Sequence, residues 1–122
     1  MRALLAEPLE IAVLHGDLHH NNVLDGGARG WLAIDPKGLL GERGYEYATM
    51  LCNPDAAIAL APGRLARQIS VAAQAGRLEP ARLTRWILAH AGVSAAWCMA
   101  DGFDPKPVLA LAEVAKALAD GA

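Results

Sequence analysis

The sequence predicts an α+β fold, and three observations support this: the chain length, one short hairpin pattern and a run of helical patterns. Two short apolar segments, 23–24 and 31–34, flank a stretch that contains Gly26 and Gly27. Glycine tolerates the positive φ angles of a tight turn, so the pattern indicates a β-hairpin. From about residue 62 onward, apolar residues recur at helical spacing. With 122 residues the chain forms at most one domain, large enough to bury about two thirds of its unfolded surface.

Before the hairpin, the chain is expected to pass from a helix through a strand to a loop. Residues 1–7 are typical of the tail of a helix, and the apolar run 11–14 indicates a buried strand or the start of a loop. Residues 15–22 are too polar for either element and predict a loop. The hairpin then folds the chain back, so Asn22 before its first strand and Asp35 after its second should emerge at the same end.

After the hairpin, Pro36 and Gly38 indicate a loop, and residues 45–51 are typical of a short helix that ends at Asn53 and Pro54. Three longer helices are then expected over 63–76, 80–100 and 105–119, with Pro80 at a first helical position and Asp104 as a cap. Their expected inner faces are Leu65, Ile69, Ala72 and Ala73; Leu83, Trp86, Ile87, His90, Ser94, Trp97 and Cys98; and Val108, Leu111, Ala112, Ala115 and Leu118.

Composition excludes some classes of partner and favours others. The net charge of −2 gives no basic patch for a nucleic acid, and it suits a cationic substrate. No apolar run approaches the roughly 18 residues that span a bilayer, so no membrane segment is expected. Cys52 and Cys98 lack metal-ligand spacing, and we expect them to be reduced, buried thiols of a cytoplasmic protein.

The most informative segments are HGDLHHNNVL at 15–24 and IDPKG at 34–38. They place Asn22 five residues after Asp17, and a second aspartate, Asp35, after the hairpin. Phosphoryl transfer from ATP uses this set of groups, in which one carboxylate accepts the proton of the attacking hydroxyl while an amide oxygen and a second carboxylate hold magnesium. We therefore predict Asp17 as the catalytic base and Asn22 and Asp35 as Mg²⁺ ligands, with ATP as co-substrate.

The loop has glycine at position 16, where protein kinases carry arginine, and HGD in that place resembles the aminoglycoside phosphotransferase branch of the kinase-like fold. From Leu14 to Pro54 the chain resembles the streptomycin 6-kinase and hydroxyurea-antibiotic kinase group, most specifically in IDPKG and GERGYEYA. The resemblance implies that residues 1–122 form the C-terminal lobe of a protein-kinase-like fold. It also implies transfer of the γ-phosphoryl group to a hydroxyl of an aminoglycoside, with streptomycin the first candidate, and a role for Glu46 in steadying the catalytic loop.

A complete enzyme of this kind also needs a nucleotide lobe, which the chain is expected to lack. No glycine-rich phosphate loop precedes His15, and no lysine precedes Lys37. The chain is then a fragment, and a competing hypothesis is a non-catalytic remnant or binding module that self-associates through its exposed lobe interface. A third hypothesis is a kinase of the same fold that acts on another small alcohol.

A metallohydrolase is the alternative that the histidines of the loop raise. His15, His19 and His20 lie close to Asp17 in sequence, and histidine with carboxylate occurs in zinc and di-metal hydrolases. The segment is not helical and no second histidine-rich segment completes the set, so this alternative ranks well below the phosphotransferase. His15 is expected to pack and hydrogen-bond in order to hold the loop.

Several other residues have two open interpretations. Lys37 could meet a phosphate or lie in solvent. Glu42, Asp101 and Asp104 could bind the guanidinium or ammonium groups of an aminoglycoside through charge-assisted contacts, or could be surface residues, with helix capping favoured for Asp104. His90, Trp86 and Trp97 lie on the apolar stripe, and we expect them in the core.

Overall fold

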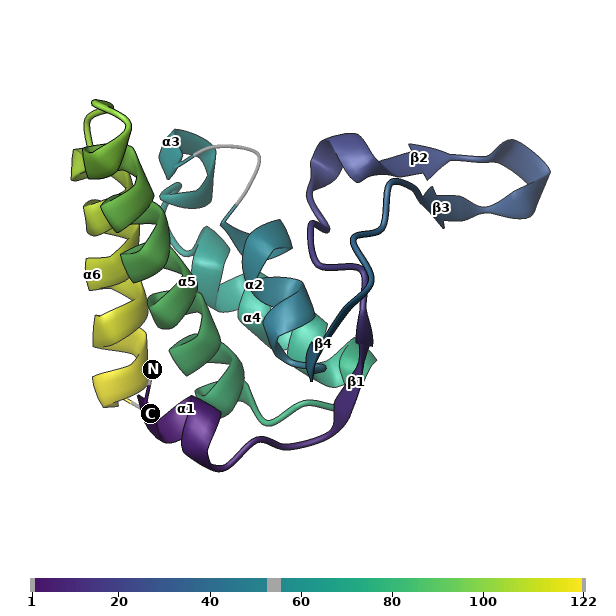
Figure 1. Cartoon of the computed structure of the whole chain (residues 1–122), viewed down its shortest axis with the longest axis horizontal. Helices are drawn as coiled ribbons and strands as arrows, with labels where there is room; N and C mark the ends of the chain where they lie inside the picture. Colours follow the sequence, from purple (N-terminus) through teal and green to yellow (C-terminus); the bar gives the residue numbers. More distant parts are fainter. Residues whose placement is uncertain (1, 53–55, 122) are drawn as a thin grey trace.

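The computed structural model describes residues 2–52 and 56–121, and it has an α+β architecture in which a helical body carries a projecting hairpin (Figure 1). The predicted α+β class, mainly helical with a small hairpin, is therefore confirmed. The elements, in chain order, are α1 (Arg2–Ala6), β1 (Ile11–Leu14), η1 (His20–Asn22), β2 (Val23–Asp25), η2 (Gly27–Arg29), β3 (Trp31–Ala33), β4 (Leu39–Glu42), α2 (Tyr45–Leu51), α3 (Ala56–Ala59), α4 (Arg64–Gly76), α5 (Pro80–Ala100) and α6 (Lys106–Gly121). Within this part of the chain, no helix is both long and apolar enough to cross a membrane.

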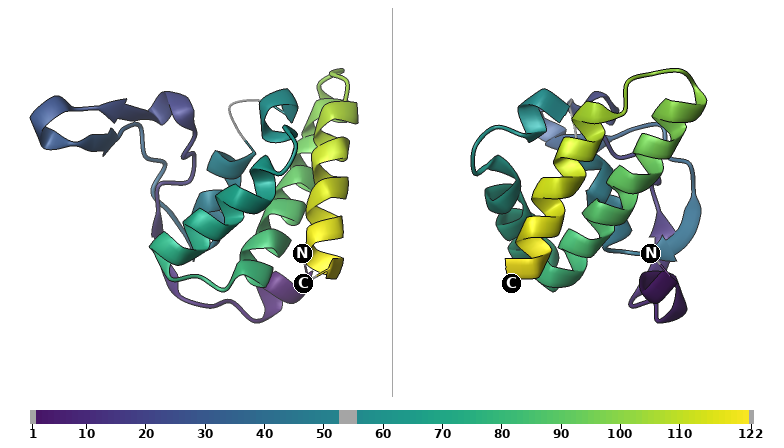
Figure 2. Two further views of the ribbon diagram at one scale, coloured as in Figure 1. Left: turned by 180° about the vertical axis from the view of Figure 1, so that it is seen from behind. Right: turned by 90° about the vertical axis from the view of Figure 1, so that its left-hand side faces the viewer.

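Helix α5 is the centre of the helical body. It packs most extensively on α6, which runs beside it (Figure 2), and also contacts α2 and α4. The three long helices begin and end within two residues of the predicted positions, because each has one apolar face that must be covered. The core consists mainly of side chains from these helices and from α1 and α2: Leu4, Ala48, Leu51, Ala59, Leu65, Ile69, Ala73, Leu83, Trp86, Ile87, Leu111 and Ala115.

The predicted inner face of α5 is wrong at its C-terminal end. Trp97 was expected in the core, but it is 58% exposed, whereas Ala91 and Ala95 are buried. Residues two apart on an α-helix point about 200° apart around its axis, so a helix that buries Ala95 turns Trp97 to solvent. Trp86, at the other end of the same helix, is buried as predicted.

The strands form two separate antiparallel pairs. β2 pairs with β3 in the predicted hairpin, with Leu24 opposite Leu32. β1 pairs with β4, with Val13 opposite Leu40. β4 was not predicted, since its residues were assigned to the loop after Asp35. The strand at 11–14 is confirmed but is not buried as a whole, because only Leu14 faces the core.

The segment between α2 and α4 was also only partly anticipated. Helix α2 is confirmed at Tyr45–Leu51, and the expected end at Asn53 and Pro54 lies outside the described residues. α3 was not predicted, because four residues are too few to show helical periodicity.

A buried ion pair joins β4 to α5. Glu42, only 6% exposed, receives two hydrogen bonds from Arg82, from Nη2 to Oε1 at 2.7 Å and from Nε to Oε2 at 2.8 Å. Trp86 Nε1 donates to the same carboxylate at 2.7 Å, and the Leu9 N–H donates at 2.9 Å. These donors, Arg82 foremost, lower the pKa of Glu42 from 4.5 to about 2. The guanidinium also donates to Glu7 O at 2.7 Å, so it binds the N-terminal segment to the helices.

We predict that Arg82→Met lowers the free energy of unfolding by about 3–5 kcal/mol, because the variant leaves the Glu42 carboxylate buried without its main partner. Urea denaturation monitored by circular dichroism measures the change. Lys116→Met is the matched control, since its ion pair with Asp120 is exposed on α6 and should contribute about 0.5 kcal/mol or less. A loss for Arg82→Met no larger than for the control would contradict the prediction.

The same ion pair should also make stability depend on pH. A carboxyl group whose pKa is lower in the folded state contributes stability above its ordinary pKa and loses it as the group is protonated. For Glu42 the loss falls between pH 4.5 and about 2. We therefore expect the difference in unfolding free energy between the wild type and Arg82→Met to narrow over this range. If the difference in unfolding free energy stayed constant from pH 7 to pH 2, the protonation of Glu42 would not be the cause of the pH dependence.

Candidate active site

The HGD loop lies between β1 and β2, where the hairpin arm joins the body (Figure 1). Gly16 occupies the middle of the HGD sequence with φ +90°, a conformation that side-chain-bearing residues rarely adopt. A Cβ at this position would lie 2.9 Å from Leu39 Cδ1. The backbone angle and the close approach of β4 explain the glycine at this point of the loop.

His15 links the loop to three other parts of the site. Its N–H donates to Glu46 Oε2 at 2.6 Å, and its carbonyl oxygen accepts from the Lys37 N–H at 2.6 Å. Its ring Nδ1 accepts from the Asp17 N–H at 3.2 Å, so the neutral ring carries its proton on Nε2, which lies 2.5 Å from Ile34 O. All four polar groups of His15 are engaged, and the expectation that it holds the loop is confirmed.

Glu46 anchors the loop to the helical body. It lies in the first turn of α2, and its carboxylate accepts from the N–H groups of both His15 and Gly16, at 2.6 and 3.0 Å. A carboxylate that binds two consecutive N–H groups fixes the orientation of the peptide between them. The loop-steadying role that the resemblance implied for Glu46 is therefore confirmed by its contacts.

The structure brings Asn22 and Asp17 together. The Asn22 amide nitrogen donates to the Asp17 carbonyl oxygen at 2.9 Å and lies 3.5 Å from Asp17 Oδ2. His19 Nε2 is 3.2 Å from the same amide nitrogen and 3.6 Å from Asp17 Oδ2. Asn22 is buried, while the Asp17 side chain is 37% exposed, so the carboxylate can reach a substrate.

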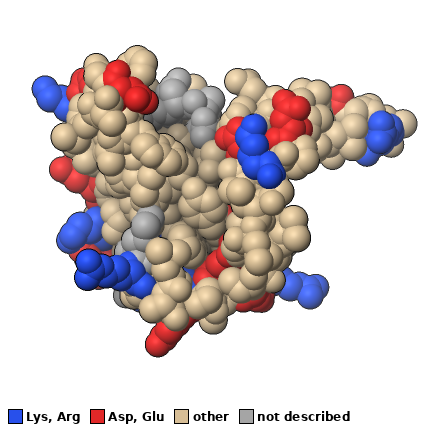
Figure 3. Space-filling model, viewed as in Figure 1, with Lys and Arg blue, Asp and Glu red and all other residues tan. Residues whose placement is uncertain are grey.

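Asp35 emerges beside this pair because of the hairpin. Ile34, the residue before Asp35, donates its N–H to Asn22 O at 2.8 Å. Asp35 itself has φ +55°. In residues 2–52 and 56–121, nothing forms a hydrogen bond or an ion pair with the Asp35 carboxylate. Figure 3 shows acidic side chains beside a basic one where the arm joins the body.

The oxygen donors in this region fit a magnesium ion. Because the Asn22 amide nitrogen faces a carbonyl oxygen, which can only accept, the amide oxygen is turned away from Asp17 O and can serve a cation. Amide and carboxylate oxygens are ligands that Mg²⁺ prefers, and few protein ligands suffice when phosphates and water complete the shell. Among the described side chains, no group of three His, Cys, Asp or Glu is placed to hold a metal ion, and this includes His15, Asp17, His19 and His20.

Other candidate residues lie elsewhere. Glu42 was a candidate for binding a cationic substrate, and this is wrong, because its carboxylate is buried and paired with Arg82. Asp104 caps α6 by accepting from the Lys106 N–H at 3.0 Å, as favoured for it. Asp101 is exposed at the end of α5, in the connection between α5 and α6. Cys52 and Cys98 are free thiols, as expected, although both are only partly buried.

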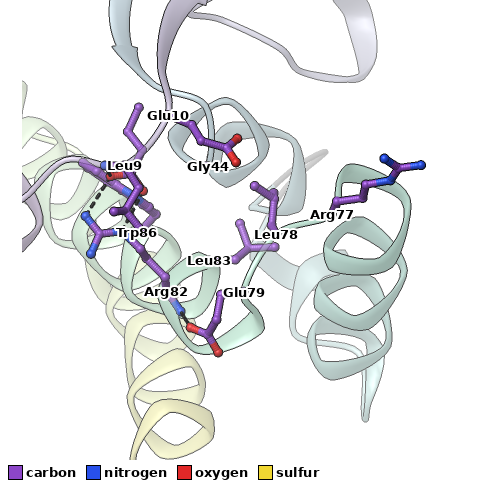
Figure 4. Close-up of a pocket in the computed structure, with 10 residues that line it drawn as sticks. Leu9, Glu10, Gly44, Arg77, Leu78, Glu79, Arg82, Leu83 and Trp86 are labelled. Atoms are coloured by element: carbon purple, nitrogen blue, oxygen red, sulfur yellow. Dashed lines mark hydrogen bonds and ion pairs between the residues drawn. The ribbon is translucent and has the colours of Figure 1, made fainter.

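A cavity of about 220 Å³ lies at the opposite end of β1 from the loop (Figure 4). Leu9, Leu78, Leu83 and Trp86 are the large apolar residues of its lining, and its three carboxylates already have partners. Glu42 binds Arg82, Glu10 binds Arg43 at 2.6 Å, and Glu79 caps α5. These three carboxylates therefore contribute to the fold.

Two arginines with structural roles were missed by sequence analysis. Arg82 holds Glu42, and Arg43 donates to Glu10 and to the carbonyl oxygen of Gly76 at 2.6 Å, next to the C-terminal end of α4. The hydrogen bond with Glu10 raises the pKa of the Arg43 guanidinium, so this arginine is positively charged when it makes these contacts. Neither arginine has a local sequence signal, because their partners lie more than 30 residues away.

A comparison with known protein families identifies the family to which the chain belongs. The family of aminoglycoside/hydroxyurea antibiotic resistance kinases matches residues 1–102. The chain belongs to this family, as the resemblance in the first half of the sequence predicted.

Three curated relatives share the matched region. The chain is 55% identical over 106 residues to streptomycin 3''-kinase of Klebsiella pneumoniae, 35% identical over 111 residues to hydroxyurea phosphotransferase of Kitasatospora aureofaciens, and 34% identical over 102 residues to streptomycin 6-kinase of Streptomyces griseus. These alignments cover 83%, 89% and 81% of the chain, but only 40%, 31% and 33% of the relatives. The chain thus spans less than half the length of each relative. No solved structure matches it.

We predict that Gly16→Ala destabilises the protein by about 1–2 kcal/mol, because alanine is strained at φ +90° and its Cβ would press on Leu39. Gly92→Ala is the matched control. This glycine lies within α5 with nothing near the position of a Cβ, so the change should stabilise by up to about 1 kcal/mol. Urea denaturation of both variants measures the change in unfolding free energy, which should be a loss for Gly16→Ala and a gain for Gly92→Ala. Equal changes in the two variants would contradict the strain predicted at Gly16.

Proposed function

We propose that this chain carries the catalytic loop of an ATP-dependent phosphotransferase that acts on a hydroxyl of streptomycin. The observation that carries the proposal is the hydrogen-bonded set that joins Asp17 to Asn22 and Asn22 to the strand before Asp35. In this proposal residues 1–122 form the C-terminal lobe of a kinase-like enzyme. The 3''-hydroxyl is the favoured acceptor, because the 55% identical relative is a streptomycin 3''-kinase and the streptomycin 6-kinase is only 34% identical.

Asp17 is the proposed base. Its half-exposed carboxylate orients the acceptor hydroxyl and takes its proton as the oxygen attacks the γ-phosphorus of ATP. The new P–O bond forms while the bond from the γ-phosphorus to the bridging oxygen breaks, and ADP leaves. The contacts of His15 and Glu46 support this role because they hold the backbone of the loop in one conformation.

Asn22 and Asp35 are the proposed Mg²⁺ ligands, through the amide oxygen and the free carboxylate. When bound, the metal neutralises negative charge on the phosphates. The remaining residues act by position. The hairpin sets the separation of Asn22 and Asp35. The hydrogen bond from the Asn22 amide to the Asp17 carbonyl oxygen holds the proposed base close to one proposed metal ligand.

A second candidate function is that of a non-catalytic remnant or binding module. It is favoured by the apolar face of the β1–β4 pair, where Val13 and Leu40 are 78% and 75% exposed. Such a surface favours association with another polypeptide, including a second copy. Sedimentation velocity over a range of concentrations would then show a mass that rises with concentration.

We expect streptomycin incubated with this chain, Mg²⁺ and ATP to gain one phosphoryl group, detected by mass spectrometry and located on the sugar by NMR. Asp17→Asn should lower the rate about 10²–10⁴-fold, as expected for the loss of a general base. Asp120→Asn, on the exposed surface of α6, is the matched control and should leave the rate unchanged.

Three outcomes would contradict the proposal or part of it. Equal rates for Asp17→Asn and the wild type would remove Asp17 as the base. No phosphorylation by the wild type, together with association that depends on concentration, would favour the binding module. Transfer to hydroxyurea or to a simple alcohol in preference to streptomycin would keep the chemistry but change the acceptor.

A further inference from the structure

Lys37 is held against the HGD loop by its backbone. Its N–H donates to the carbonyl oxygen of His15 at 2.6 Å. A Cβ built on Gly16 would lie only 3.2 Å from the Cβ of Lys37, so the lysine stem starts beside the residue that precedes Asp17. Position 37 also follows Asp35 by two residues. The fold thus starts this side chain beside Gly16, which precedes the proposed base in the chain.

The ammonium group of Lys37 has no partner within the described ranges. The ion pairs found there use His19, Arg43, Arg82 and Lys116, and none uses Lys37, which is exposed. In the segment 15–42 the only other lysine or arginine is Arg29, in the turn at the far end of the arm.

We propose that Lys37 is a phosphate-binding residue of this site, whose ammonium contacts the non-bridging oxygens of the nucleotide triphosphate. The inference rests on the proposed function. The two carboxylates of Asp17 and Asp35 would repel a polyphosphate, and one cation beside them offsets part of that repulsion. A flexible lysine stem lets the ammonium follow the phosphate, and phosphoryl transfer is accelerated mainly by such positioning and electrostatic contacts.

Binding of inorganic tripolyphosphate to the whole chain in the presence of Mg²⁺ tests the inference without requiring turnover. Isothermal titration calorimetry should give an affinity that Lys37→Met lowers about tenfold to a hundredfold, the range expected for one charge-assisted contact. Lys37→Arg keeps the charge and should retain most of the affinity. Because the side chain is exposed, both variants should unfold at the wild-type temperature.

Lys106→Met is the matched control, since Lys106 is an exposed lysine at the start of α6 and its loss changes the net charge equally. Wild-type affinity in Lys37→Met, an equal loss in Lys106→Met, or no binding by the wild type would each overturn the inference. The transfer assay separates this result from the proposed function. If tripolyphosphate binding depends on Lys37 but no phosphoryl transfer occurs, the inference is retained and the proposed function is rejected. If transfer occurs but binding does not depend on Lys37, the proposed function is retained and the inference is rejected.

Discussion

The geometry of the HGD loop depends on one carboxylate, that of Glu46. The loop has no strand partner over its first residues, so its N–H groups need acceptors from elsewhere, and Glu46 supplies them to both His15 and Gly16. The carboxylate lies in the first turn of α2, where the helix dipole favours negative charge. The helix therefore stabilises the anion that holds the loop, and Asp17 follows directly after the fixed peptide.

A second carboxylate, four residues earlier, binds the same segment to the body of the protein. Glu42 is buried and can stay charged there only because Arg82 and Trp86 both donate to it. The arginine also reaches the N-terminal segment through Glu7 O. The short stretch 42–46 thus joins the HGD loop, through Glu46, to α5 and to the chain before β1, through Glu42.

The elements that could be predicted are those whose signal is local. α4, α5 and α6 each repeat apolar residues over several turns, and the hairpin has glycines between two apolar runs. β4 and α3 could not be predicted, because four residues show no clear period and a strand of this length exists through its partner. The prediction that Trp97 lies in the core was wrong. The apolar stripe shows which residues of the helix could be buried, but the packing of the neighbouring helices decides which of them are buried.

The sequence by itself determined the spacing of Asp17 and Asn22, the hairpin that returns the chain to the same end at Asp35, and the family to which the chain belongs. Only the tertiary structure decided that Glu46 reaches the loop, that Glu42 is buried and paired with Arg82, and that the Lys37 side chain starts beside Gly16. The reason is physical. The bonds of Glu46 and Glu42 join residues 30 to 44 positions apart, and such contacts depend on how the helices pack, which no local pattern of residues encodes.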